Sequence, residues 1–409
     1  MPRKRLDQVD SMRPLKQAGV VSTHVLLFFG PAASVSAGAL LTLLHVSREG
    51  FFFISACMLT YAYQDIGHGG WGRFYQRRFV SVVIPYLCWT VIYYFHDLPG
   101  ANFASTGDAL DRLLRTLVTG YYQLYFLVVI MQFYLVFPLV LALLRRTRGH
   151  HGLVVAAAAA AQVTLAILLH WRILTQTWVQ SEASSYVLYL IGGTVVAFHL
   201  EEVHAWVCRH ARLIIALTAL AAAAAEGVYY LAETGVTSVL GSTDDAFQPS
   251  VIPWNVGAIA FIYLAGVALV KPGRSGRLRA VVRSGSDNAC GIYLAHLLII
   301  YVLIFIGFGR LIAHLPWPAA CAITVVLVYL SSVALTSVLA RTPLALPLTG
   351  RPRQTWRSLL TGDGGGHDQQ GQRARPVAPP AQPARQRSAK AQQLTETEYD
   401  GDTRLDPVG

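Results

Sequence analysis

The chain has 409 residues, of which 54% are hydrophobic and 13% are charged. Soluble globular domains carry about 25% charged residues, so this composition excludes an ordinary soluble protein. The formal net charge of +11 would suit a nucleic-acid-binding protein, but Lys and Arg gather in short loops between apolar runs. That distribution argues against nucleic acid as a partner and predicts an all-α polytopic membrane protein in a lipid bilayer.

We expect about ten membrane-spanning helices, because each apolar run is near the roughly 20 residues needed to cross a bilayer. The expected spans are residues 14–30, 35–63, 80–96, 122–144, 153–170, 186–200, 212–232, 253–270, 288–308 and 317–340. The second run is too long for one straight span, and Arg48-Glu49-Gly50 interrupts it, so we expect a kinked or broken helix. The first run lacks a small-residue cleavage site, so we expect no cleaved signal peptide.

The loops predict that both ends of the chain are cytoplasmic. With the N-terminus inside, the inner loops hold thirteen Lys and Arg residues and the outer loops hold four. This bias follows the positive-inside rule and predicts a multi-pass protein of the cell membrane.

Composition divides the chain into a membrane domain, residues 1–345, and a disordered cytoplasmic tail, residues 346–409. From residue 362 the tail is rich in Gly, Pro, Gln and Arg. Such a segment cannot bury enough apolar surface to offset its ordering entropy. The five cysteines show neither CxxC nor metal-ligand spacing, and we expect no metal site.

Arg13 and His24 lie eleven residues apart in the first expected helix. Eleven residues return to nearly the same helix face and rise about 16 Å. One face would therefore carry a cation at the membrane surface and an imidazole near mid-membrane, where ionisable groups are costly and usually functional. A cationic flank plus one histidine bonded to a neighbouring helix explains the two residues equally well.

Arg48 and Glu49 form an adjacent charged pair inside the second apolar run. The two charges should be partnered, because an isolated buried charge is expensive. They indicate either an ion pair that holds a helix break or a polar pocket that reaches His24. A second intramembrane histidine, His296, makes a polar site shared by two helices more plausible.

Arg73, Arg77 and Arg78 have aromatic neighbours at the start of the third expected span. Basic and aromatic residues together favour an interfacial helix. Arginine also matches phosphate oxygens bidentately, so a nucleotide phosphate is the alternative partner.

Together these segments resemble the acyltransferase family 3 of integral membrane acyltransferases. Arg13, ten residues and His24 match its signature, and Gly291 to His296 matches its late G-I-Y-L-x-H motif. Three more stretches resemble family motifs: Arg48 to Leu59, with Ala56 where glycine is usual, Arg77 to Tyr86, with Ser81 where a second arginine is common, and Tyr122 to Leu127, with Gln123 where histidine is usual. The likeness covers about residues 10–345, and no residue role is carried over to Ser81 or Gln123.

The resemblance implies transfer of an acyl group, most often acetyl, from acetyl-CoA or another acyl-CoA to a hydroxyl of a glycan, glycolipid or small-molecule acceptor. His24 would act as general base, with an acyl-imidazole intermediate as the less favoured variant. The resemblance also implies that Arg13 belongs to the signature pair and that Arg48, oriented by Glu49, stabilises the oxyanion. A basic rim would hold the coenzyme A phosphates and would consist of Arg13, Lys16, Arg73, Arg77 and Arg78. The acceptor side would be lined by Tyr125, Tyr293 and His296.

Two other function classes remain open. A polysaccharide or lipid-linked sugar exporter would show paired broken helices in the two halves of the chain. A non-catalytic scaffold that recruits partners through its tail would lose its function on truncation after about residue 345, whereas an enzyme would tolerate that cut.

Overall fold

The computed structural model describes residues 6–32, 34–100, 103, 105–171, 173–174, 179–235, 247–271 and 276–354. Within these ranges all regular structure is helical, as the sequence predicts. Residues 355–409, most of the predicted tail, lie outside the described residues.

Eight helical stretches in the described ranges are long and apolar enough to cross a membrane. They are α3 (Val35–Leu44) together with α4 (Val46–Tyr63), and then α5 (Trp71–Asp97), α7 (Tyr125–Arg146), α8 (His151–His170), α11 (Ala211–Glu233), α12 (Val251–Val270), α13 (Gly276–Phe305) and α15 (Trp317–Leu339). A ninth span arises if α9 (Val187–Phe198) and α10 (Leu200–Arg209), which meet at 100°, count as one.

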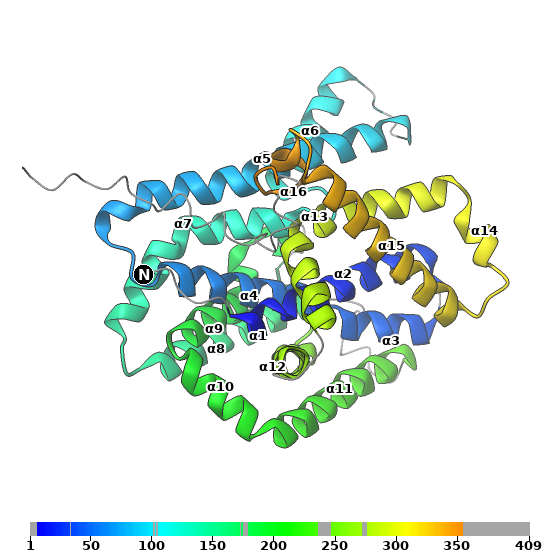
Figure 1. Cartoon of the computed structure of the whole chain (residues 1–409). Coiled ribbons are helices and arrows are strands. Elements are labelled where there is room, and N and C mark those ends of the chain that lie inside the picture. The colour runs from blue at the N-terminus through cyan, green and yellow to red at the C-terminus, as the bar shows by residue number, and fades with distance from the viewer. Residues whose placement is uncertain are drawn as a thin grey trace, which may run out of the picture.

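The first predicted span corresponds to α2 (Met12–Phe29), which follows the short helix α1 (Asp7–Asp10). Arg13, Lys16, Gln17 and His24 make α2 more polar than the eight spans, yet it lies in the middle of the bundle beside α3, α4, α13 and α15 (Figure 1). Its Val21 and Val25 are completely buried. Lys16 and Gln17 are also buried, so part of the polar face of α2 is enclosed by other helices, as expected for intramembrane polar residues with a function.

The second predicted span is broken, as the sequence predicts, but the break lies at His45 rather than at Arg48-Glu49-Gly50. Arg48, Glu49 and Gly50 are inside the first turns of α4. The chain enters α3 through a cap in which Ser34 Oγ accepts a bond from Ala37 N–H at 3.4 Å.

Helices α4 and α9 pack closely through Gly193. A Cβ at this residue would overlap the carbonyl oxygen of Phe53 and would lie 3.2 Å from Cβ of Ala56. The glycine therefore brings the two backbones together, as small residues do between membrane helices. This contact supports α4 along the half that follows Arg48 and Glu49.

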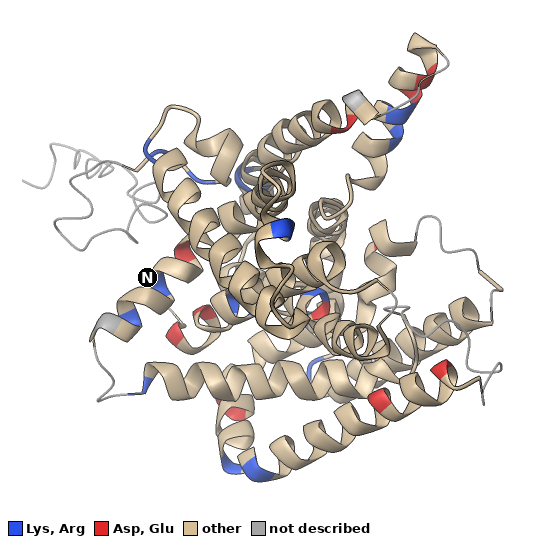
Figure 2. Cartoon of the chain, turned by 90° about the vertical axis from the view of Figure 1, so that its right-hand side faces the viewer, with Lys and Arg blue, Asp and Glu red and all other residues tan. Residues whose placement is uncertain are grey.

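Charged residues lie mostly at helix ends and in connections, while most helix shafts carry none (Figure 2). An exception outside the bundle is α6 (Thr106–Thr119), which projects from one end beside the end of α5 (Figure 1). None of its residues is buried, and Leu110, Leu114 and Val118 form an exposed apolar stripe. This pattern is typical of a helix at a membrane interface.

After α13 the chain forms the small helix α14 (Phe308–Ile312), then α15, and then the short helix α16 (Ala345–Thr349), beyond which the described residues end. Helix α16 packs on α5, α13 and α15. The buried Trp89 donates from Nε1 to the carbonyl oxygen of Leu348 at 3.1 Å. Residues 346–354 were predicted to belong to the tail. Some of them therefore contact the bundle instead.

Candidate active site

His24 on α2 and His296 on α13 form a direct imidazole pair. Nδ1 of His24 lies 3.1 Å from Nε2 of His296 and 3.0 Å from the carbonyl oxygen of Val20. Nδ1 of His296 lies 2.6 Å from the carbonyl oxygen of Tyr293. His296 is completely buried, whereas His24 is partly exposed.

These partners determine which nitrogens carry protons. A carbonyl oxygen can only accept, so Nδ1 of His296 carries its proton and Nε2 of a neutral His296 is an acceptor. Nδ1 of His24 then faces two acceptors and donates to both. Nε2 of His24 therefore carries the lone pair, and no hydrogen bond occupies it within the described part of the chain. The pair holds His24 in the tautomer that a general base needs.

The imidazole pair lies toward the end of α2 opposite Arg13, beside the loop that leads into α7. The ring of Tyr122 meets His24 edge to face with centroids 5.5 Å apart, and Tyr122 is 50% exposed. Its φ of +23° is in the left-handed region, which is strained for a tyrosine. Backbone strain of this kind concentrates at functional sites.

The segment of α13 that carries His296 is anchored by two tyrosines. Tyr93 on α5 donates its hydroxyl to the carbonyl oxygen of Leu294 at 2.6 Å. Tyr293 donates to the carbonyl oxygen of Gln123. These bonds hold the motif Gly291–His296 against the entrance to α7.

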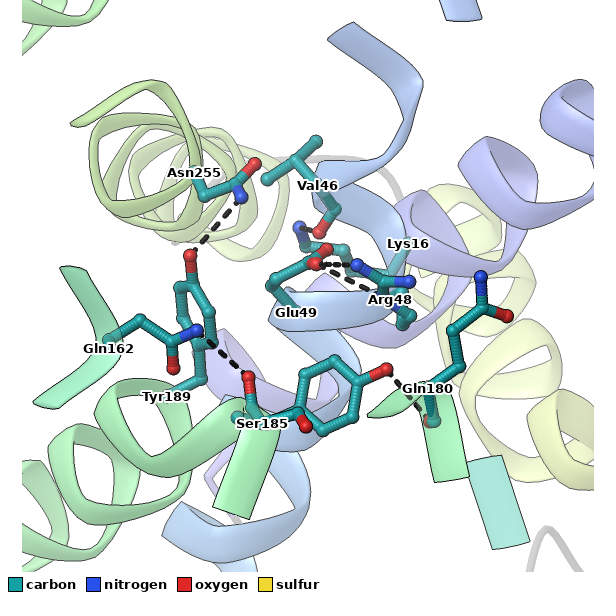
Figure 3. A network of polar contacts seen from close by, with 10 residues as sticks. Lys16, Val46, Arg48, Glu49, Gln162, Gln180, Ser185, Tyr189 and Asn255 are labelled. Atoms are coloured by element: carbon teal, nitrogen blue, oxygen red, sulfur yellow. Dashed lines mark hydrogen bonds and ion pairs between the residues drawn. The ribbon is translucent and has the colours of Figure 1, made fainter. Parts of the chain in front are cut away.

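A second polar group occupies the bundle interior between α2 and α4 (Figure 3). Arg48 donates to Glu49 Oε1 from Nε at 3.0 Å and from Nη2 at 2.5 Å. The Arg48 guanidinium also lies 5.1 Å from the Tyr186 ring centre and 4.7 Å from that of Phe247. Lys16 and Arg48 both point toward Glu49 (Figure 3). The expectation that Arg48 and Glu49 are partnered is therefore confirmed.

Lys16 does not lie on an exposed rim. It is 1% exposed, and its Nζ donates to the carbonyl oxygen of Val46 at 2.8 Å. Gly50 provides the space, because a Cβ there would overlap the lysine side chain. Lys16 thus belongs to the interior group with Arg48 and Glu49 (Figure 3).

The group around Arg48 lies nearer the start of α2 than His24 does. Lys16 packs against Gly50 and Gly19 against Ser47, so Arg48 is level with residues 16–19 of α2. At least five residues, about 7 Å of helix, separate that level from His24. On the side of the imidazole pair, the ring of Tyr293 lies 6.0 Å from that of His296.

The arginines of the predicted basic rim lie in the first turns of α2 and of α5. Arg13 pairs with Asp10 at 3.2 Å, and its side chain is 28% exposed. Arg73 and Arg77 are exposed on α5. Arg78 lies 5.0 Å from the ring centre of Tyr63.

Arg351 joins this basic end, although the sequence reading placed it in the tail. It pairs with Asp287 at 3.7 Å, and a Cβ on the preceding residue, Gly350, would lie 3.2 Å from the Ser81 carbonyl oxygen on α5. Its sequence signal was the basic run that directly follows the last span. We refer to Arg13, Arg73, Arg77, Arg78 and Arg351 together as the basic end.

Comparison with known proteins identifies the family. A family model described as an acyltransferase domain matches residues 7–336. This chain belongs to acyltransferase family 3. No curated protein and no solved structure matches the sequence of this acyltransferase. The match covers α2, α4 and α13, so every residue of the imidazole pair and of the buried charged group lies within the family domain. In the described part of this acyltransferase no three His, Cys, Asp or Glu side chains are grouped to hold a metal ion.

Proposed function

We propose that this membrane acyltransferase transfers an acyl group, acetyl in the simplest case, from a coenzyme A thioester to a hydroxyl group, with His24 as general base. The observation that carries the proposal is the unoccupied Nε2 lone pair of His24, oriented by His296 through Nδ1. Such proton transfer contributes about 10²–10⁴-fold to a rate.

In the proposed reaction, Nε2 of His24 accepts the proton of the acceptor hydroxyl as its oxygen attacks the thioester carbonyl. The carbon–sulfur bond then breaks, and the same proton passes from His24 to the departing thiolate, giving an ester and free coenzyme A. Arg48, held by Glu49, adds positive potential for the developing oxyanion. Its separation from His24 makes this contribution electrostatic rather than a direct contact.

The donor would bind at the basic end. Coenzyme A carries several phosphate charges, and Arg13, Arg73, Arg77 and Arg78 supply guanidinium groups that match phosphate oxygens. The positive-inside rule puts this end in the cytoplasm. The pantetheine arm would then run along α2 over the roughly 16 Å that separate Arg13 from His24.

The acceptor would approach from the opposite end, where His24 is partly exposed beside Tyr122. A sugar ring suits this mouth because its apolar C–H face packs on an aromatic ring while its hydroxyls remain available. Tyr125, Tyr293 and His296 then stand behind the reacting groups, and a glycan or glycolipid is the proposed acceptor class.

Transport is the less favoured alternative, although a second helix break exists at His199 between α9 and α10. Helix α10 is amphipathic, with Glu201, Glu202 and Trp206 exposed. It therefore resembles an interfacial helix that follows a span rather than an unwound segment at mid-membrane.

The test is an assay of the purified protein in lipid nanodiscs with radiolabelled acetyl-CoA, with and without a panel of glycans. Wild-type protein should consume the thioester and label at least one glycan. His24→Ala should lose at least about 100-fold in turnover, while His150→Ala, at an exposed histidine, should remain normal. Near-normal turnover by His24→Ala would defeat the general-base role, and glycan export without thioester consumption would favour the transporter.

A further inference from the structure

Gln17 is a completely buried side chain of α2 whose hydrogen-bonding groups are unused. Its exposure is 0%, and neither Oε1 nor Nε2 has a hydrogen-bond partner among the described residues. Leaving a buried donor or acceptor unpaired costs free energy, whereas an apolar side chain of similar shape would carry no such cost. Gln17 therefore has a feature that stability alone does not explain.

The position of Gln17 on α2 relates it to the two signature residues. It follows Arg13 by four residues and precedes His24 by seven. Spacings of four and seven return to nearly the same helix face, so Arg13, Gln17 and His24 form one stripe. The amide lies about 6 Å along the axis from Arg13 and about 10 Å from His24.

The environment of this stripe also has spare acceptor capacity. Among the described residues Oε2 of the buried Glu49 has no hydrogen-bond partner, although Oε1 is bound twice by Arg48. The neighbour of Gln17 in sequence, Lys16, donates to the Val46 carbonyl oxygen and makes no hydrogen bond to the Gln17 amide in the described part of the chain. The interior between the basic end and the imidazole pair is thus polar and only partly satisfied.

We propose that Gln17 binds an amide group of the donor's pantetheine arm, which rests on the proposed use of a coenzyme A thioester. The arm contains two secondary amides between the phosphates and the sulfur. Gln17 Nε2 donates to the carbonyl oxygen of one amide and Oε1 accepts from the N–H of the second amide, which uses both of its unpaired groups. An amide at this height sets how far the thioester reaches toward His24.

The test compares Gln17→Met with wild type on two acetyl donors. Methionine keeps the length and unbranched shape of glutamine but removes the amide. We expect kcat/KM for acetyl-CoA to fall about 10- to 50-fold, corresponding to two hydrogen bonds. For S-acetyl-2-mercaptoethanol, which has no amide, we expect a change below about twofold. The melting temperature should stay equal or rise, because an unpaired buried group is removed.

Gln162→Met is the matched control. Gln162 is also buried, but its Nε2 donates to the carbonyl oxygen of Ser185 at 2.8 Å. Its replacement should lower the melting temperature and should not discriminate between the two donors.

Three results for Gln17→Met would overturn the inference: an unchanged kcat/KM for acetyl-CoA, an equal loss with both donors, or a fall in melting temperature like that of Gln162→Met. If wild-type protein consumes neither thioester, the result contradicts the proposed function, and the inference about Gln17, which rests on it, is contradicted as well. That result is distinct from an active wild type with an unaffected Gln17→Met variant.

Discussion

The Nδ1 proton of His24 has two acceptors, and only one of them comes from a distant part of the chain. The Val20 carbonyl belongs to the same helix and would be present in any α2, whereas Nε2 of His296 is supplied by α13. The second acceptor fixes the rotation of the ring as well as its tautomer. His296 is therefore a positioning residue in the proposed reaction, and the group that meets the hydroxyl is His24.

This distinction predicts different outcomes for two replacements of His296. His296→Leu removes the acceptor and should lower kcat about 10- to 100-fold while KM for acetyl-CoA changes little, because loose orientation of a catalytic group costs about that much. His296→Gln keeps an amide oxygen near the position of Nε2 and should recover most of the rate. Steady-state kinetics of both variants measures this split. Equal losses in the two variants would mean that His296 serves packing alone.

At the scale of helices, the apolar runs predicted most spans but not how they bend. The sequence indicated a break within residues 35–63, and the structure places it at His45 because Arg48 and Glu49 are paired and can remain helical. Helix α6 lies in a segment that was predicted to be an outer loop, because its apolar residues form only an i, i+4, i+8 stripe on a polar background. The predicted span 186–200 ends at the bend at His199, but the helix α10 that follows was not predicted, because its Glu201, Glu202 and Arg209 give the segment the composition of a loop.

The contact between α4 and α9 gives a prediction at this scale. Gly193→Ala places a Cβ against the Phe53 carbonyl oxygen, so the helices must separate, at a cost of about 1–3 kcal/mol. The melting temperature should fall, and activity should fall with it because α4 carries Arg48 and Glu49.

Gly192→Ala provides the control for that variant. Its Cβ would meet the Phe53 ring at 3.8 Å, an ordinary contact. Thermal unfolding in the same detergent compares the two. Equal melting temperatures would show that the close approach at Gly193 does not limit stability.

For the whole molecule, the sequence predicted the class and the family but only part of the site. The five motifs place His24, Arg48 and His296 in order along the chain, and their family is shown by the match over residues 7–336. The pairing of His24 with His296 joins residues 272 positions apart, which no local pattern can specify. The burial of Lys16 and the unused amide of Gln17 likewise depend on how α2 is enclosed by other helices. A hydropathy scale gives Lys16 and Gln17 the same polar value whether their side chains are buried or exposed, so it cannot predict that they are buried.

The boundary of the folded domain gives the last prediction, made with two truncations. A chain ending at residue 343 lacks α16, so the buried Nε1 of Trp89 loses its acceptor at Leu348. An unpaired buried donor costs about 1–3 kcal/mol. The truncation also removes the buried residues Ala345 and Thr349, so the bundle loses its packing against them. The melting temperature and acyl transfer should both fall.

A chain ending at residue 354 keeps α16 and the bond from Gln354 N–H to the Ala340 carbonyl oxygen at 2.8 Å. It removes the Gly-, Pro- and Gln-rich segment, whose composition lacks the apolar residues that a packed core requires. Melting temperature and transfer should match those of the full chain. Because every residue assigned to the proposed site precedes residue 355, a loss of transfer at unchanged melting temperature would instead assign a role in the reaction, or in recruiting a partner, to residues 355–409.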